Sequence, residues 1–234
     1  MKKKITALMI ATAMLVSMMA SCTITITKKD KDNENDVSSD STSSYVVWDY
    51  YDWDYDTSSE DVSSAPSVNV DDIDISDDWK SWQIALDGVV YTIPCDVSEF
   101  EKNGWTLDGK DESLEPNHYT LAQKLYKGDN YIYVQVLNET SKTITTGEGK
   151  ISQVDVDGDD DVSLVLPGGL VFDKNLTVET IKAKYGEPTS EYVYDDWVAL
   201  IYRGDRAYQS IHFSIYTDES KWKYSDVSIQ NVVS

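Results

Sequence analysis

The segment YTLAQKLYKGDNYIYVQVLN, residues 119–138, decides the fold of this chain. Its centre, Lys127–Asn130 (KGDN), supplies turn-forming residues between two runs rich in tyrosine and apolar residues. Two such runs around a short loop that contains glycine predict a β-hairpin, with strands over 119–126 and 131–138. Alternate apolar residues of the second strand predict the side that lies on a hydrophobic core: Ile132, Val134 and Val136.

Further strands and two short helices are expected on both sides of this hairpin. The second helix, 177–185, is the clearest, because Thr177 can cap its start, Gly186 can stop it and Pro188 prevents its continuation. The first helix is expected over 96–103. The strands are expected over 82–86, 89–93, 150–156, 162–166, 191–194, 197–202, 209–216 and 224–230. These elements predict an α+β fold class.

The order of strand, helix and several antiparallel strands occurs twice, at a spacing of about 75 residues, as in proteins built from internal repeats. We therefore predict one α+β domain over 79–234 that is composed of two similar units of short helix plus antiparallel strands. The first unit spans about 82–158 and the second about 162–234.

The segment LTVETIKAKYGEPTSEY, residues 176–192, resembles a helix-to-strand signature shared by two families. These are the β-lactamase-inhibitor-protein-like family and the outer-membrane assembly small-lipoprotein (SmpA/OmlA-like) family. In both, a short amphipathic helix ends in Gly-x-Pro and runs into an antiparallel sheet, which matches Thr177–Tyr185 and Gly186-Glu187-Pro188 here. The resemblance implies a protein that clamps another protein or scaffolds an envelope complex, although a short motif supports fold more than function.

The first 22 residues, MKKKITALMIATAMLVSMMASC, have the layout of a secretory signal: three lysines, an apolar run and a small pair before Cys22. Met19–Cys22 resembles the lipobox of bacterial lipoproteins. That resemblance implies a signal peptide over 1–21 and a diacylglycerol on Cys22, which would anchor the chain to the cell membrane, facing outside the cytoplasm. The whole layout resembles lipoproteins of Gram-positive bacteria. An ordinary cleaved signal or an uncleaved anchor are the alternatives.

A long acidic segment follows the anchor. Residues 28–78 carry 16 Asp and Glu against 3 Lys, with little apolar content, so residues 22–78 are predicted to form a disordered, lipid-anchored linker. Within it, Tyr45–Tyr55 (YVVWDYYDWDY) alternates aromatic and acidic residues. This segment either docks on a partner or on the chain's own domain, or it is a solvated part of the linker.

The charge and the cysteines limit the classes of partner. The net charge of −22 argues against nucleic acid and against binding to anionic lipid, because both require a basic face. If Cys22 carries lipid, Cys95 is the only remaining thiol and no internal disulfide can form. Cys95 is expected to be a small buried apolar residue rather than a nucleophile.

No catalytic motif is present in the sequence: there is no Gly-x-Ser-x-Gly, no His-Glu-x-x-His and no phosphate-binding glycine loop. No catalytic residue and no cofactor are therefore predicted. A weak calcium candidate contains Asp155, Asp157, Asp159 and Asp161, but it lacks the spacing of an EF-hand loop and is alternatively a solvated turn. The tryptophans could form a sugar-stacking platform or belong to the core.

These observations predict a membrane-anchored extracytoplasmic lipoprotein whose domain is a non-enzymatic module that binds a protein or another ligand. The expected partner is an extracytoplasmic protein or a cell-wall ligand. Two alternatives remain: an enzyme that acts on cell wall or glycan through Asp and Glu residues, and a carbohydrate-binding module.

Overall fold

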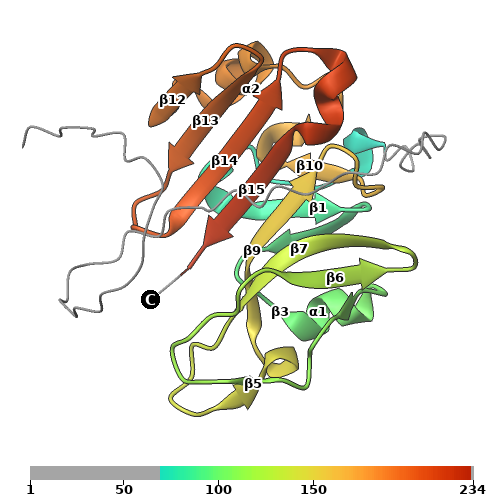
Figure 1. Cartoon of the computed structure of the whole chain (residues 1–234), viewed down its shortest axis with the longest axis vertical. Coiled ribbons are helices and arrows are strands. Elements are labelled where there is room, and N and C mark those ends of the chain that lie inside the picture. The colour runs from blue at the N-terminus through green and yellow to red at the C-terminus, as the bar shows by residue number, and fades with distance from the viewer. Residues whose placement is uncertain (1–68, 233–234) are drawn as a thin grey trace, which may run out of the picture. The chain divides into compact units, whose positions relative to one another are not determined.

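The computed structural model describes residues 69–232, and antiparallel strands dominate this part of the chain (Figure 1). Its two α-helices are short, α1 (Val97–Lys102) and α2 (Val178–Tyr185). The predicted α+β class is therefore corrected to mainly β. The strands are β1 (Gln83–Leu86), β2 (Val89–Thr92), β3 (Cys95–Asp96), β4 (Thr106–Leu107), β5 (Ser113–Leu114), β6 (Gln123–Lys127), β7 (Asn130–Leu137), β8 (Ile144–Thr145), β9 (Lys150–Asp157), β10 (Leu164–Leu166), β11 (Leu170–Val171), β12 (Ser190–Val193), β13 (Trp197–Arg203), β14 (Gln209–Tyr216) and β15 (Asp226–Asn231).

A nine-stranded antiparallel sheet, the main sheet, organises the domain. Its order is β12-β13-β14-β15-β9-β7-β6-β4, with β3 also paired to β9. A smaller sheet has the order β11-β10-β1-β2, and β5 pairs with β8. Short 3₁₀ helices connect several strands: η1 (Val70–Asp72), η2 (Trp79–Ser81), η3 (Thr146–Glu148), η4 (Pro167–Gly169) and η5 (Glu219–Tyr224).

Both halves of the domain contribute strands to both sheets. The first half supplies β4, β6, β7 and β9 to the main sheet and the β1–β2 hairpin to the small sheet. The second half supplies β12 to β15 and the β10–β11 hairpin. The halves meet where β9 pairs with β15 and where β1 pairs with β10. The main sheet and the small sheet therefore both continue across the junction, whereas the two-stranded β5–β8 sheet lies within the first half.

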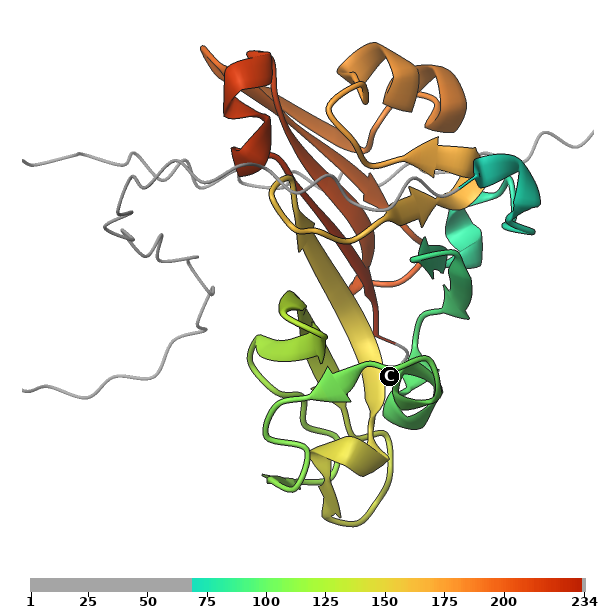
Figure 2. The same ribbon diagram turned by 90° about the vertical axis from the view of Figure 1, so that its right-hand side faces the viewer.

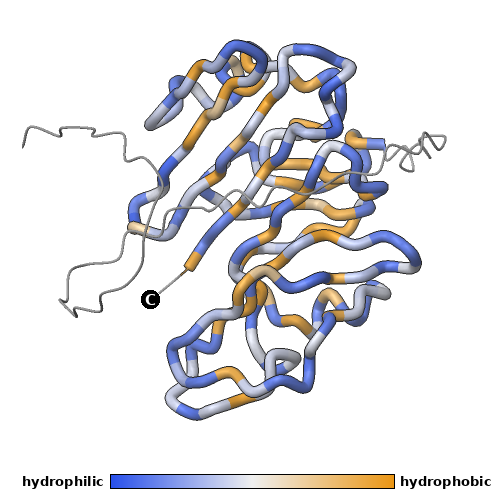
Figure 3. The backbone as a smooth tube through the Cα atoms, in the orientation of Figure 1, coloured by the Kyte–Doolittle hydropathy of each residue, from blue (hydrophilic) through white to orange (hydrophobic). Residues whose placement is uncertain are grey.

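One side of the main sheet, the inner face, packs against the small sheet and both α-helices (Figure 2). A row of fully buried side chains crosses this face from β7 to β13: Val134, Val154, Ile229, Ile211 and Tyr202. Hydrophobic and hydrophilic residues alternate along these strands (Figure 3), because successive side chains of a strand point to opposite faces. The residues predicted as the core face of the hairpin, Ile132, Val134 and Val136, are fully buried.

The helix α2 has the predicted ends. Its Thr177 Oγ1 accepts a hydrogen bond from the Thr180 backbone N–H at 3.2 Å, and this bond satisfies one of the free donors of the first turn. Ile181 and Tyr185 are buried against the core. Gly186 has a φ of +80°, a conformation that glycine adopts at little cost. The helix therefore stops where the sequence predicts.

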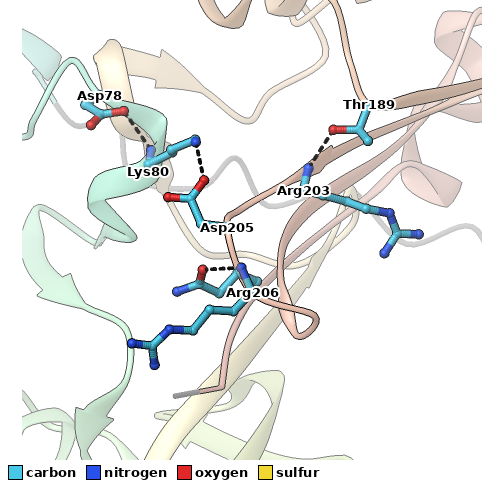
Figure 4. A network of polar contacts seen from close by, with 7 residues as sticks. Asp78, Lys80, Thr189, Arg203, Asp205 and Arg206 are labelled. Carbon is cyan, nitrogen blue, oxygen red and sulfur yellow. Dashed lines mark hydrogen bonds and ion pairs between the residues drawn. The ribbon is translucent and has the colours of Figure 1, made fainter. Parts of the chain in front are cut away.

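Polar contacts join the start of the domain to the turn between β13 and β14 (Figure 4). The Lys80 ammonium pairs with Asp205 at 2.7 Å. Ser76, inside the predicted linker, accepts a hydrogen bond from the Gly168 backbone N–H at 2.7 Å. Residues 69–78, the last part of the predicted linker, thus lie among the described residues, and the backbone of Ser76 is bonded to η4.

The predicted signal peptide 1–21, Cys22 and the acidic segment Tyr45–Tyr55 lie outside the described residues. Within the part of the chain that is described, no helix is long and apolar enough to cross a membrane.

Candidate functional site

The candidate site is the side of the main sheet that faces away from the core, which we call the outer face. Its side chains alternate with the buried ones along each strand. The strand register aligns one continuous row across six strands, from β6 to β13. The row is composed of Lys124, Tyr133, Asp155, Ser228, His212 and Ile201. All members of this row except Ile201 are polar or aromatic, whereas the buried row on the inner face is mostly apolar.

Three aspartates form the middle of the outer face, and we call Asp155, Asp157 and Asp226 the carboxylate centre. Asp157 on β9 lies directly opposite Asp226 on β15, and Asp155 is two residues earlier on the same face of β9. Side chains directly opposite each other in an antiparallel pair have Cβ atoms about 5 Å apart. The register thus brings like charges together on two central strands, which ordinarily disfavours the pairing.

Glutamine side chains fix one carboxylate of this centre. The Gln153 Nε2 donates to both oxygens of Asp155, at 2.9 Å each. In turn, Gln230 Nε2 donates to Gln153 Oε1 at 3.0 Å. This chain of amides holds the Asp155 carboxylate in one orientation with neutral donors, so its negative charge is solvated but not cancelled by these contacts.

The electrostatics of the centre favour protonation. Desolvation raises the pKa of Asp226 to about 7, an effect that the Ser214 hydroxyl opposes and that the neighbouring Asp157 and Asp155 increase. Desolvation, followed by repulsion from Asp159 and Asp155, raises the pKa of Asp157 to about 6. Burial also raises the pKa of Asp155, against hydrogen bonds from Ser228 and Gln153. Two members of the centre, Asp157 and Asp226, therefore titrate nearer to neutral pH than ordinary aspartates, and the pKa of Asp155 is shifted in the same direction.

Aromatic side chains flank the carboxylate centre on both sides. On β6 and β7, Tyr131 packs edge-on against Tyr133 with ring centroids 5.5 Å apart. The Lys124 ammonium lies over the Tyr131 ring, 4.0 Å from its centroid. A cation so close to an aromatic face is attracted by the ring quadrupole. This part of the outer face therefore already holds one ammonium group of the protein itself.

The second aromatic flank lies beyond β14. Trp197 on β13 stacks on Tyr194 with centroids 4.2 Å apart and faces Tyr216 across the β13–β14 pair. Tyr216 also contacts Tyr224, which is 52% exposed. Of the tryptophans considered for a sugar platform, Trp197 therefore lies on the outer face. Trp82 and Trp105 are buried in the core, and Trp79 and Trp222 pack against it.

The turn after β9 brings together a set of carboxylates that differs from the predicted calcium candidate. Oxygens of Asp157, Asp159 and Asp160 lie within 4.8 Å of one another. Asp160 joins this group because its Oδ2 accepts from the Asp157 backbone N–H at 2.8 Å. Asp155 is absent from it because β9 extends to Asp157 and sets Asp155 back along the strand. The Asp161 carboxylate contacts Asn130 Nδ2 at 3.3 Å.

His212, on β14, lies beside the carboxylate centre in the same row as Ser228. Its Nε2 is buried and has no hydrogen-bond partner among the described residues. Desolvation, followed by repulsion from Arg203, lowers the pKa of His212. The imidazole is therefore neutral at neutral pH and contributes no positive charge to the outer face.

Cys95 lies away from the outer face, in a shallow pocket of about 380 Å³ that it shares with Tyr91, Asn103 and Lys150. Burial, followed by repulsion from Asp96 and Glu99, raises the pKa of the thiol to about 11. A raised pKa of the Cys95 thiol agrees with the expectation that this thiol is unreactive. The side chain is only partly buried, however, because β3 runs along the rim of the pocket.

Sequence reasoning missed Asp226, Asp160 and His212 as members of a site. The alternation of Val227 and Ile229 could have placed Asp226 on a polar face. Its position opposite Asp157 depends on the β9–β15 pairing, which joins residues far apart in the chain and has no local signature. Comparisons with protein-family models, with curated proteins and with solved structures found no match.

Proposed function

We propose that this chain is a lipid-anchored extracytoplasmic lipoprotein and that the outer face of its main sheet binds cationic side chains of a partner protein. The domain is a non-enzymatic module in this proposal, and Cys22 supplies the anchor. The family resemblance implies a binding role, and in those families a short helix runs into an antiparallel sheet. The mainly antiparallel architecture is compatible with that resemblance.

The carboxylate centre carries the proposal. Asp155, Asp157 and Asp226 lie together on a sheet face whose neighbouring groups are mostly neutral: serines, glutamines, tyrosines and an uncharged histidine. Such grouped carboxylates weaken the fold, so their presence is better explained by a ligand that neutralises them. A Lys or Arg side chain from a partner would supply the missing positive charge.

The aromatic flanks fit the same ligand. Lys124 over Tyr131 shows that a tyrosine ring of this face accommodates an ammonium group at 4.0 Å. Carboxylates combined with aromatic rings favour cations, because both the charge and the ring quadrupole attract them. Arginine and lysine of a protein partner satisfy both features, and the acidic chain would attract such a partner at long range.

An oligolysine peptide tests this proposal on the full-length chain. We expect binding at about pH 8 and weaker binding below about pH 6, since protonation removes the charge of the carboxylate centre. Replacing Asp155→Asn together with Asp226→Asn should abolish most of the heat measured by titration calorimetry. The matched control, Asp72→Asn with Asp74→Asn, removes the same charge outside the outer face and should bind nearly as tightly as the unchanged chain. An equal loss of binding heat in both double variants would refute a specific site on the outer face.

One observation favours a second candidate, an enzyme that acts on glycan. Asp157 and Asp226 are directly opposed and have pKa values raised to about 6 and about 7. Retaining glycosidases use two carboxyl groups about 5 Å apart, and two directly opposed aspartates are one way to bring a pair of carboxyl groups close together. Neither the pocket around Cys95 nor the pocket around Asp87 includes this pair. Release of reducing sugar from cell-wall glycan, lost in Asp226→Asn, would support this candidate instead.

A further inference from the structure

The strand β12 forms one edge of the main sheet and pairs only with β13 among the described strands. Its register with β13 shows which backbone groups are free. The Tyr194 N–H donates to the Trp197 carbonyl at 2.9 Å and closes the hairpin. Antiparallel pairs alternate between bonded and non-bonded residues. Tyr192 and Ser190 therefore bond toward β13, whereas Glu191 and Val193 direct their N–H and C=O groups away from the sheet.

The start of β12 is fixed in place, so this edge is preformed. Thr189 Oγ1 accepts a hydrogen bond from the Arg203 backbone N–H at 3.0 Å (Figure 4). On the inner side, Lys182 of α2 donates to both carboxylate oxygens of Glu191 at 2.7 Å. This ion pair compensates the one charge that β12 carries. A helix and a hydroxyl thus hold the strand in place, and no other described strand pairs with its outer edge.

The edge is protected only by its short length and by the charge of Glu191 on its inner side. Proteins usually guard such edges with lysine, proline or a bulge. β12 contains neither lysine nor proline, and its pairing with β13 is regular. Large apolar side chains are exposed along it and just beyond its end: Tyr192 is 51% exposed, Val193 72% and Tyr194, the next residue, 50%. Glu191 is the exposed charged residue of the strand. Free backbone donors and acceptors beside apolar side chains are the features by which an extended peptide joins a sheet.

The charge around β12 identifies the kind of strand that fits. Residues 186–196 carry four acids, Glu187, Glu191, Asp195 and Asp196, and no Lys or Arg. Lys182 and Lys221 compensate Glu191 and Asp196. A second copy of this chain would bring the same acids to the edge, and the chain's own Tyr45–Tyr55 segment is acidic as well. A strand with cationic ends is complementary.

We infer that the free edge of β12 is a strand-addition site for an extended segment of another protein, with apolar residues flanked by Lys or Arg. The added strand pairs with the backbone of Glu191 and Val193, and its apolar side chains lie beside Tyr192 and Tyr194. This site uses other residues than the carboxylate centre, so it can be present whether or not the outer face binds cations.

Amide hydrogen exchange on the full-length chain tests this inference, with the synthetic peptide Lys-Val-Thr-Val-Thr-Val-Lys as the probe. We expect the peptide at about millimolar concentration to slow exchange of the Glu191 and Val193 amides by about tenfold or more, because new hydrogen bonds protect them. The Tyr192 amide, already bonded to β13, should change less. No slowing at Glu191 and Val193 would overturn the inference.

Two matched variants separate strand addition from other binding. Val193→Pro removes an outward N–H that β13 does not use, so the fold should persist while the protection of Glu191 is lost. Val193→Thr keeps the N–H and should retain the protection. Both should bind oligolysine like the unchanged chain, whereas Asp155→Asn with Asp226→Asn should leave the protection of Glu191 unchanged. Protection that persists in Val193→Pro would contradict strand addition.

Three further outcomes would assign the edge differently and overturn the inference. Equal protection by the peptide with Glu in place of Lys would exclude charge complementarity. Concentration-dependent dimers that Val193→Pro abolishes would identify a second copy as the occupant. Protection without peptide that disappears when residues 45–55 are deleted would identify the chain's own acidic segment.

Discussion

Single residues of the carboxylate centre make the folded protein less stable when they are ionised. The pKa of Asp226 rises from an ordinary value of 3.8 to about 7 on folding, so folding favours its protonated form. This contribution to stability is fully present below the unfolded-state pKa and is lost as the pH rises through about 7. The apolar side chains on the inner face of the same strand, including Val227 and Ile229, are buried and offset the destabilisation by the ionised carboxylate.

Replacing Asp226→Asn should therefore stabilise the protein at about pH 8, by about 1–2 kcal/mol in the free energy of unfolding. The amide carries no charge and can still bond to Ser214. The difference should shrink as the pH falls through about 7 and disappear only below about 3.8, where Asp226 is protonated in both the folded and the unfolded state. Urea unfolding across this pH range measures the effect. Asp129→Asn, in the exposed turn between β6 and β7, is the control. An equal gain in the free energy of unfolding for this variant would show that the effect comes from net charge alone.

The Cys95 thiol offers a second prediction at this scale. With its pKa raised to about 11, the thiolate is rare at neutral pH although the residue borders a pocket. In the full chain with Cys22→Ser, Cys95 should react with an aromatic disulfide reagent roughly 100-fold more slowly than in the urea-unfolded chain. Equal rates, followed by absorbance, would show that neither burial nor the nearby acids suppress this thiol.

At the scale of elements, the sequence predicts what local chemistry determines. The Lys127–Asn130 turn, the buried alternation of β7 and the ends of α2 follow from glycine, from period-2 patterning and from capping. The first strand of the hairpin starts at Gln123 rather than Tyr119, because Tyr119 makes an isolated bridge to Leu137. The two-residue strands β4 and β5 are not among the strands expected from the sequence, since such short pairings depend on distant partners.

The cap of α2 gives the prediction for this scale. Thr177→Ala removes the acceptor for the Thr180 N–H and should lower the free energy of unfolding by about 1 kcal/mol. Thr177→Ser keeps a hydroxyl and should lose only a small part of that. Thermal unfolding by circular dichroism compares the three proteins, and an unchanged midpoint for the alanine variant would show that the cap is dispensable.

At the scale of the whole molecule, the pairing of strands between the two halves could not be predicted from the sequence. The sequence indicates two units of similar order, but not that β9 pairs with β15 and β1 with β10. These long-range pairings place Asp226 beside Asp157 and thereby create the candidate site. Nothing in either strand's local pattern encodes the choice of neighbour, because both are simply alternating strands with one apolar face.

Because the halves share both sheets, residues 82–158 and 162–234 should unfold together. A single urea transition with the same midpoint is expected for fluorescence of Trp105, in the first half, and of Trp197, in the second. Each probe is read in a variant whose other tryptophans are replaced by phenylalanine. Two separated transitions would mean that the halves are independently stable, despite the shared strands.

The membrane attachment is a further prediction for the whole chain. With no basic face expected from its acidic composition, the lipid on Cys22 is the proposed attachment. Cys22→Ala should therefore release the protein from the membrane fraction, while near-ultraviolet circular dichroism of the domain remains unchanged. Membrane association that persists after signal cleavage in this variant would contradict lipid anchoring.

The most direct test of cation binding at the carboxylate centre is the titration of Asp226 by carboxyl-carbon NMR, in the full-length chain, with and without the oligolysine peptide. A cation bound at the carboxylate centre stabilises the ionised carboxylate, so the pKa of about 7 should fall by about one unit or more when the peptide is present. An Asp226 titration that the peptide leaves unchanged, while the peptide still binds the chain, would contradict the outer face as the binding surface.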